Sequence, residues 1–168
     1  MVLSIGEGGM VIDESENILD DFSQAFADRL FSLFPEWRML QKIERASDGS
    51  NYLSLEIAAP AEANAVCGLT VTTENNEVTI GFDYYHGHFF DQVGNGTYLG
   101  ADYALYFLSQ ILNEEIFFTS WWIGDQLLAF STIENGKVLM DDALVGEYGR
   151  VRIRSWNGSR NSDINATV

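Results

Sequence analysis

The chain has 168 residues, of which 46% are hydrophobic and 13% aromatic, and this size predicts one domain with a single substantial core. Its 25 acidic and 9 basic residues give a formal net charge of -16, which opposes binding to nucleic-acid phosphates and favours a cationic partner, although acidity can also serve solubility alone. The N-terminus has no export signal, and no apolar run approaches the ~20 residues that cross a bilayer, so we expect a cytoplasmic protein without a membrane role.

The N-terminal part predicts an arm followed by a helix. Residues 1–12 combine short apolar runs with three glycines, which is typical of an edge strand or a loose arm. From Asp13 onward, apolar residues recur at three- and four-residue spacing as far as Phe34. This pattern predicts an amphipathic helix that is capped by Asp13 or Ser15 and ended by Pro35.

Four strand-like runs follow. The first two, at about 37–45 and 52–59, are separated by a turn-forming segment. The next two, at 66–74 and 77–88, are joined by Asn75 and Asn76, and because Asn tolerates positive φ this loop suits a tight hairpin. Cys67, the single cysteine, lies in an apolar run and is expected to be a small buried hydrophobe.

The C-terminal half predicts a second helix and further strands. Residues 99–112 are apolar nearly all round, which indicates a helix largely buried against the sheet. An interior strand at 116–123, a strand at 127–133, a hairpin at Asn135 and Gly136 and a last strand near 147–156 come next.

The order of these elements predicts one α+β domain over residues 1–156. We expect a mainly antiparallel sheet of about six to eight strands with two α-helices packed on one face. Residues 157–168 are polar and are expected to form a frayed tail.

Both histidines of the chain lie in one stretch, residues 77–91, with the sequence EVTIGFDYYHGHFFD. Two histidines at i and i+2 of a strand share a side, and with Asp83 and Asp91 nearby they could hold zinc or another divalent ion. If the strand is continuous, however, His86 and His88 end the apolar stripe of even-numbered residues, and Asp83 and Tyr85 face the other way. This parity favours a structural or interface role and no cofactor, while a small metal-dependent enzyme that uses His86 and His88 is the alternative.

No motif specific to an enzyme is present, so a non-catalytic protein is expected. The adjacent carboxylates Glu114 and Glu115 diverge or face solvent, and the sequence has no nucleophile elbow, phosphate loop or zinc-protease motif. Arg150, Arg152 and Arg154 alternate along the last strand. In so acidic a chain, a ladder that pairs with internal carboxylates is favoured over contact with nucleic acid.

A long acidic segment is the best candidate for a partner surface. From Ala46 through Gly136 there is no lysine or arginine, and this segment is rich in aromatic residues. Aromatic anchors within a charged rim are typical of a protein interface. The residues expected to contact a partner are Asp83, Tyr85, His86, His88, Asp91, Glu114, Glu115, Trp122 and Asp125.

Three segments between about residues 70 and 135 resemble small acidic immunity proteins encoded beside bacterial polymorphic toxins, including those of contact-dependent growth inhibition: GFDYYHGHF, ADYALYFLSQILNEE and SWWIGDQ. The resemblance implies an inhibitor without turnover that binds a cognate basic toxin domain, commonly an RNase or a DNase, and covers its active site or substrate surface. It transfers no catalytic residues. An acidic adaptor for another partner remains the further alternative.

Overall fold

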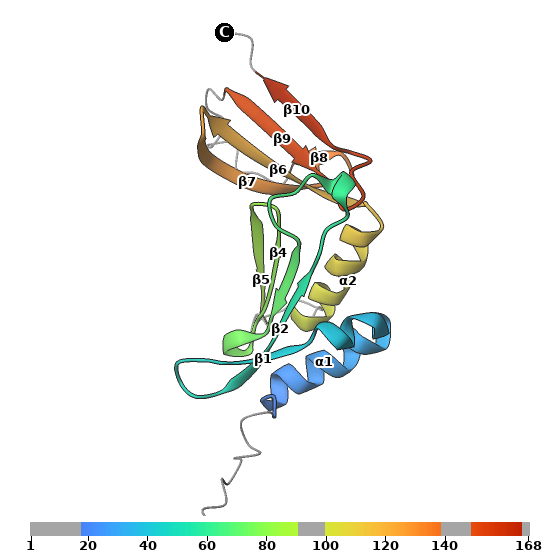
Figure 1. The fold of residues 1–168 in the computed structure, drawn as a ribbon, viewed down its shortest axis with the longest axis vertical. Helices are drawn as coiled ribbons and strands as arrows, with labels where there is room; N and C mark the ends of the chain where they lie inside the picture. The colour runs from blue at the N-terminus through green and yellow to red at the C-terminus, as the bar shows by residue number, and fades with distance from the viewer. Residues whose placement is uncertain (1–17, 91–99, 139–148, 166–168) are drawn as a thin grey trace, which may run out of the picture.

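The computed structural model describes residues 18–90, 100–138 and 149–165. These residues form two five-stranded antiparallel sheets and two α-helices (Figure 1). The first sheet has the strand order β1-β2-β3-β4-β5, and the second has the order β10-β9-β6-β7-β8. The α+β class, the antiparallel pairing and the two helices are confirmed. The strands divide into two sheets, however, where one sheet of six to eight strands was expected.

Helix α1 (Asp21–Leu33) begins at a cap other than the expected ones. The carboxylate of Asp20 accepts a hydrogen bond of 2.7 Å from the backbone amide of Ser23, one of the amides that the first helical turn leaves without a partner. Asp13 and Ser15, like the expected arm at 1–12, lie outside the described residues. The helix ends before Pro35, as predicted.

A 3₁₀ helix, η2 (Pro35–Leu40), follows α1 where a strand was expected. Trp37 is buried in it and stacks on Phe34 at 4.3 Å between ring centroids. Proline at the first position suits a helical start because its amide would have no partner there. The strand expected from residue 37 is therefore limited to β1 (Lys42–Arg45).

The first sheet carries both helices on one face (Figure 1). Its other strands are β2 (Asn51–Ile57), β3 (Leu69–Thr72), β4 (Val78–Phe82) and β5 (Tyr85–Phe89). Alternate apolar residues are fully buried along β2 to β4, for example Leu55, Val71 and Ile80, as a sheet with one solvated face requires. Helix α1 packs on β2, and α2 (Gly100–Leu112) packs on β4 and β5. No helix in the described part of the chain is long and apolar enough to cross a membrane.

The connection between β3 and β4 agrees with the sequence pattern. The short 3₁₀ helix η4 (Glu74–Asn76) joins these two paired strands. Asn75 and Asn76 have φ values of 60° and 57°, the left-handed conformation that asparagine tolerates. The predicted pairing of these strands is therefore confirmed, but the loop is longer than the two residues expected, because the pair next to it is Thr72 and Thr79.

The stretch 77–91 does not form one strand. Asp83 and Tyr84 are the turn of a hairpin in which Phe82 pairs with Tyr85 and Gly81 pairs with His86. Paired residues in antiparallel strands point to the same side, so Tyr85 continues on the core side and the histidines lie on the opposite, open face. The expected parity is wrong because a two-residue turn was treated as continuous strand.

The second sheet is built around a central strand, β6 (Ile116–Ile123), as its apolar residues on both faces predicted. The other strands are β7 (Gln126–Glu134), β8 (Lys137–Val138), β9 (Arg150–Arg154) and β10 (Ser162–Asn165). Asn135 and Gly136 have φ values of 51° and 73° at the tip of the predicted hairpin. The expectation of a frayed tail is wrong for residues 162–165, because β10 pairs with β9 over its whole length.

The two sheets share one apolar core. Phe118 of β6 lies 5.1 Å from Phe82 and 5.0 Å from Tyr85 between ring centroids. Both Ile116 and Phe118 belong to the same buried cluster as the helices and the first sheet. The second sheet therefore packs on the end of the β4–β5 hairpin, near α2.

The predicted arginine ladder pairs with an internal carboxylate. Arg154 is only 3% exposed, and it donates hydrogen bonds to the carboxylate of Asp163 and to the backbone carbonyls of Asn64, Ile153 and Ser162. Asp163 also forms an ion pair with Arg152. The prediction of a cross-strand ladder is confirmed for Arg152 and Arg154, whose pairing with Asp163 holds β10 against β9, whereas the buried Nε of Arg150 has no hydrogen-bond partner among the described residues.

Candidate functional site

The residues expected to contact a partner do not form one surface. Near the β4–β5 hairpin, His86 and His88 are exposed, but Asp83 is only 8% exposed and Tyr85 packs against the core. Burial raises the pKa of Tyr85 to about 12, with further contributions from the charges of Tyr103 and Glu134. Asp91 lies outside the described residues.

Asp83 has a structural role in the hairpin. Its carboxylate accepts a hydrogen bond of 2.8 Å from the backbone amide of Val66, and its φ is 54°. The thiol of Cys67 donates to the carbonyl of Asp83, also at 2.8 Å. Partial burial is the main cause of a raised pKa of this thiol, and the negative charge of Asp83 is the second cause. Cys67 is nonetheless an exposed residue, so the expectation that it is buried is wrong.

The two histidines stand side by side on the open face of the first sheet. Their rings are 5.5 Å apart between centroids. Nδ1 of His88 lies 2.7 Å from Oε1 of Glu77 and 3.1 Å from the hydroxyl of Thr79, so the carboxylate orients this ring. Among residues 18–90, 100–138 and 149–165, no three side chains of His, Cys, Asp or Glu come together as metal ligands.

Glu114 holds the C-terminal segment to the end of α2. It has a φ of 56°, and it occupies the left-handed position of a Schellman motif in which Glu115 N–H donates to the Gln110 carbonyl. Its carboxylate accepts hydrogen bonds from the backbone amides of Asn157 and Ser159. Partial burial by itself would raise the pKa of Glu114, but these hydrogen bonds and those from nearby serine hydroxyls outweigh it and lower the pKa.

The other expected contact residues differ in exposure. Asp125 is exposed in the turn between β6 and β7, and Glu115 is exposed beyond α2. Trp122 is buried, and its indole N–H donates to the hydroxyl of Ser120. The aromatic residues around the hairpin therefore serve mainly for packing.

A cluster of two aromatic rings and two guanidinium groups joins the two sheets. The ring of Tyr84, at the tip of the hairpin, lies 4.8 Å from that of Trp122 on β6. The guanidinium of Arg150 lies 5.1 Å from the Trp122 ring, and that of Arg152 lies 5.4 Å from the Tyr84 ring. Through these cation–π contacts, Arg150 and Arg152 of β9 interact with aromatic rings of the same chain.

The sequence interpretation missed an exposed surface on α2. Tyr106 is 56% exposed and Tyr103 is 38% exposed, although most of this helix is buried. Nε2 of Gln110 donates to the hydroxyl of Tyr106 at 2.7 Å and to the carboxylate of Glu115 at 3.0 Å. Two aromatic side chains and an acidic group are thus connected along one side of the helix.

The charge of Glu134, on β7, influences Tyr103. Burial is the main cause of the raised pKa of Tyr103, and the negative charge of Glu134 is the next. We refer to Tyr103, Tyr106, Gln110 and Glu115 as the α2 tyrosine surface.

The spacing of the tyrosines was the available signal for this surface. Tyr103, Tyr106 and Gln110 lie at i, i+3 and i+7, which places them on one stripe of a helix. Their polar ends distinguish this stripe from the leucine, isoleucine and phenylalanine positions that are buried. Comparison of the chain with protein-family models, with curated proteins and with solved structures finds no match.

Proposed function

We propose that this protein is an immunity protein that binds and neutralises a cognate basic toxin domain, a nuclease, by stoichiometric contact through the α2 tyrosine surface. The observation that carries the proposal is the pair of exposed tyrosines, Tyr103 and Tyr106, of which Tyr106 is linked through Gln110 to the carboxylate of Glu115. Exposed aromatic anchors with an acidic rim suit a basic protein surface, such as the substrate cleft of a nuclease. No turnover and no cofactor are involved, and the site of action is the cytoplasm.

The charge distribution supports the same proposal. The surface lies in the segment from Ala46 to Gly136, which contains no lysine or arginine. Two cations of the described residues have acidic neighbours of their own: Arg29 forms an ion pair with Asp102, and Lys137 lies opposite Glu134 between β7 and β8. A net charge of -16 accelerates encounter with a cationic partner at low ionic strength.

Calorimetric titration tests the function directly. The titrant is the toxin domain encoded by the neighbouring gene, with its catalytic residue substituted. One-to-one binding that weakens with increasing salt is the expected result. A toxin domain that gives no heat and no complex with this protein contradicts the proposal.

Two matched pairs of variants test the surface. Tyr106→Ala should weaken binding by about 2 kcal/mol, roughly 30-fold in Kd, whereas Leu128→Ala, also at an exposed position, should have little effect. Glu115→Lys should slow association more than Asp125→Lys, which makes the same charge change at the exposed β6–β7 turn. A larger effect of Asp125→Lys would assign the interface to that turn.

A further inference from the structure

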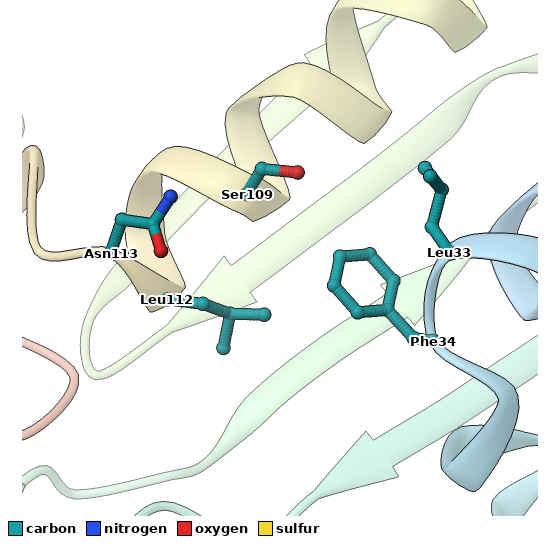
Figure 2. Close-up of a pocket in the computed structure, with 5 residues that line it drawn as sticks. All are labelled: Leu33, Phe34, Ser109, Leu112 and Asn113. Atoms are coloured by element: carbon teal, nitrogen blue, oxygen red, sulfur yellow. The ribbon is translucent and has the colours of Figure 1, made fainter.

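A pocket of about 280 Å³ lies between the C-terminal ends of the two α-helices. Figure 2 shows Leu33 and Phe34, at the end of α1, opposite Ser109, Leu112 and Asn113, at the end of α2. Its volume is just under the range of roughly 300–1,000 Å³ that drug-sized ligands occupy. It suits one long side chain better than a cofactor.

The walls of the pocket are apolar and partly fixed. Phe34 is held by stacking on Trp37, and Leu112 is half-buried against the core. Leu33 is 56% exposed, so part of its apolar side chain is open to an entering group. These three side chains can cover the methylene groups of an entering lysine or arginine.

The polar side of the pocket favours positive charge. Both helices end here, and neither has a basic residue in its last turn, so the partial negative charges of both C-termini are uncompensated by their own side chains. The hydroxyl of Ser109 donates to the Leu105 carbonyl, so its oxygen can still accept a hydrogen bond. Asn113 is exposed and offers an amide oxygen.

The pocket lies at the C-terminal end of the helix that carries the α2 tyrosine surface. Ser109 and Asn113 follow Tyr106 at i+3 and i+7, so the three residues lie on one stripe of the helix and its C-terminal end. We infer that the pocket receives a lysine or arginine side chain of the basic protein partner, an inference that rests on the proposed function. The methylene groups of that side chain lie on Leu33, Phe34 and Leu112, and its charged end meets the helix termini and Asn113.

Nuclear magnetic resonance of the isotope-labelled full chain tests the chemistry of the pocket without the toxin. The probe is Nα-acetyl-arginine methylamide, and its control is the citrulline analogue, which has the same shape but no charge. Saturable shifts of the backbone amides of Leu33, Phe34, Ser109 and Asn113 are expected with the arginine compound alone. Shifts confined to other residues, or equal shifts with citrulline, overturn the inference.

A matched pair of variants then tests the occupant. Leu33→Lys places a competing cation in the pocket, whereas Ile164→Lys makes the same change at an equally exposed position, 53%, on β10 in the other sheet. Leu33→Lys should abolish the probe shifts and raise the Kd for the toxin domain by at least about tenfold, and Ile164→Lys should do neither.

The outcomes separate this inference from the proposed function. If the toxin domain binds the wild type and both lysine variants equally well, the pocket inference is overturned and the proposed function stands. Equal weakening by both variants shows a general charge effect and also overturns the inference. Failure of the wild-type chain to bind the toxin domain overturns the proposed function and, with it, the partner inferred for the pocket.

Discussion

Substitutions of Asp83 separate two contributions to the stability of the β4–β5 hairpin. One is the left-handed backbone, with φ at 54°, and the other is the hydrogen bond of 2.8 Å that the carboxylate accepts from the Val66 amide. The change Asp83→Asn keeps both an oxygen acceptor and tolerance of positive φ. The change Asp83→Gly keeps only the backbone conformation, and Asp83→Ala keeps neither.

The expected costs follow from these differences. The left-handed region costs about 1–2 kcal/mol for a residue such as alanine, which has a Cβ but lacks the short polar side chain by which aspartate and asparagine tolerate it. A hydrogen bond to a charged acceptor contributes about 1.5 kcal/mol or more when the donor is partly buried. We therefore expect the free energy of unfolding to fall by about 3 kcal/mol for Asp83→Ala. For Asp83→Gly, which also gains freedom in the unfolded chain, the expected fall is about 2 kcal/mol, and for Asp83→Asn it is under about 1 kcal/mol.

Urea denaturation followed by tryptophan fluorescence measures this series. The midpoints should fall in the order asparagine, glycine, alanine, with the denaturant slope m unchanged. Asp125→Ala is the control, because this aspartate is exposed in another turn, and it should cost less than about 0.5 kcal/mol. If the alanine and asparagine variants are equally stable, neither the backbone conformation nor the hydrogen bond stabilises the hairpin as described.

Three further predictions concern stability and pH. Arg154→Met should lower the free energy of unfolding, measured by urea denaturation, by about 3 kcal/mol, because several carbonyls lose their donor. Asp163→Asn should lower it less, because that carboxylate is half-exposed. Equal losses of stability would contradict the assignment of these hydrogen bonds. Glu114→Gln should destabilise the protein at pH 7. Because the folded-state pKa of Glu114 is lowered from 4.5, the difference in stability between the wild type and the variant should vanish as the pH falls through that lowered value. A difference that does not change with pH would contradict this role of the Glu114 carboxylate. The pKa of Tyr85 is raised from 10.0 to about 12, so the folded state should lose stability as the pH rises between these values, because the tyrosine of the unfolded chain loses its proton first. Ultraviolet titration should show a phase of tyrosine ionisation near pH 12 that Tyr85→Phe removes. Persistence of that phase in Tyr85→Phe would refute the assignment.

Local pattern predicted most of the secondary structure. The second helix, the central strand β6 and the two hairpins with asparagine at positive φ lie where periodicity and turn chemistry placed them. These features depend on neighbouring residues alone, through backbone dihedrals and the alternation of apolar side chains. The pairing of Arg152 and Arg154 was predictable for a related reason, since arginines that alternate along a strand of an acidic chain favour carboxylates on the neighbouring strand.

The candidate surface was predictable only in composition. The acidic, aromatic character of the segment from Ala46 to Gly136 led us to expect a basic partner, which stays a prediction. It did not indicate which aromatic residues are exposed. Tyr84 and Trp122 are used to join the sheets, whereas Tyr103 and Tyr106, on a helix expected to be largely buried, reach solvent.

The sequence determines the α+β fold class, the strong negative charge and the position of most helices and strands. The folded chain was needed to show that the strands form two sheets, that β10 continues the second of them, and that Tyr85 faces the core while the histidines face outward. The physical reason is that a strand's side-chain alternation is a local property, but its direction depends on where the chain turns and on which distant strand it pairs with. A turn of only two residues, at Asp83 and Tyr84, was enough to reverse the side on which the residues of β5 lie.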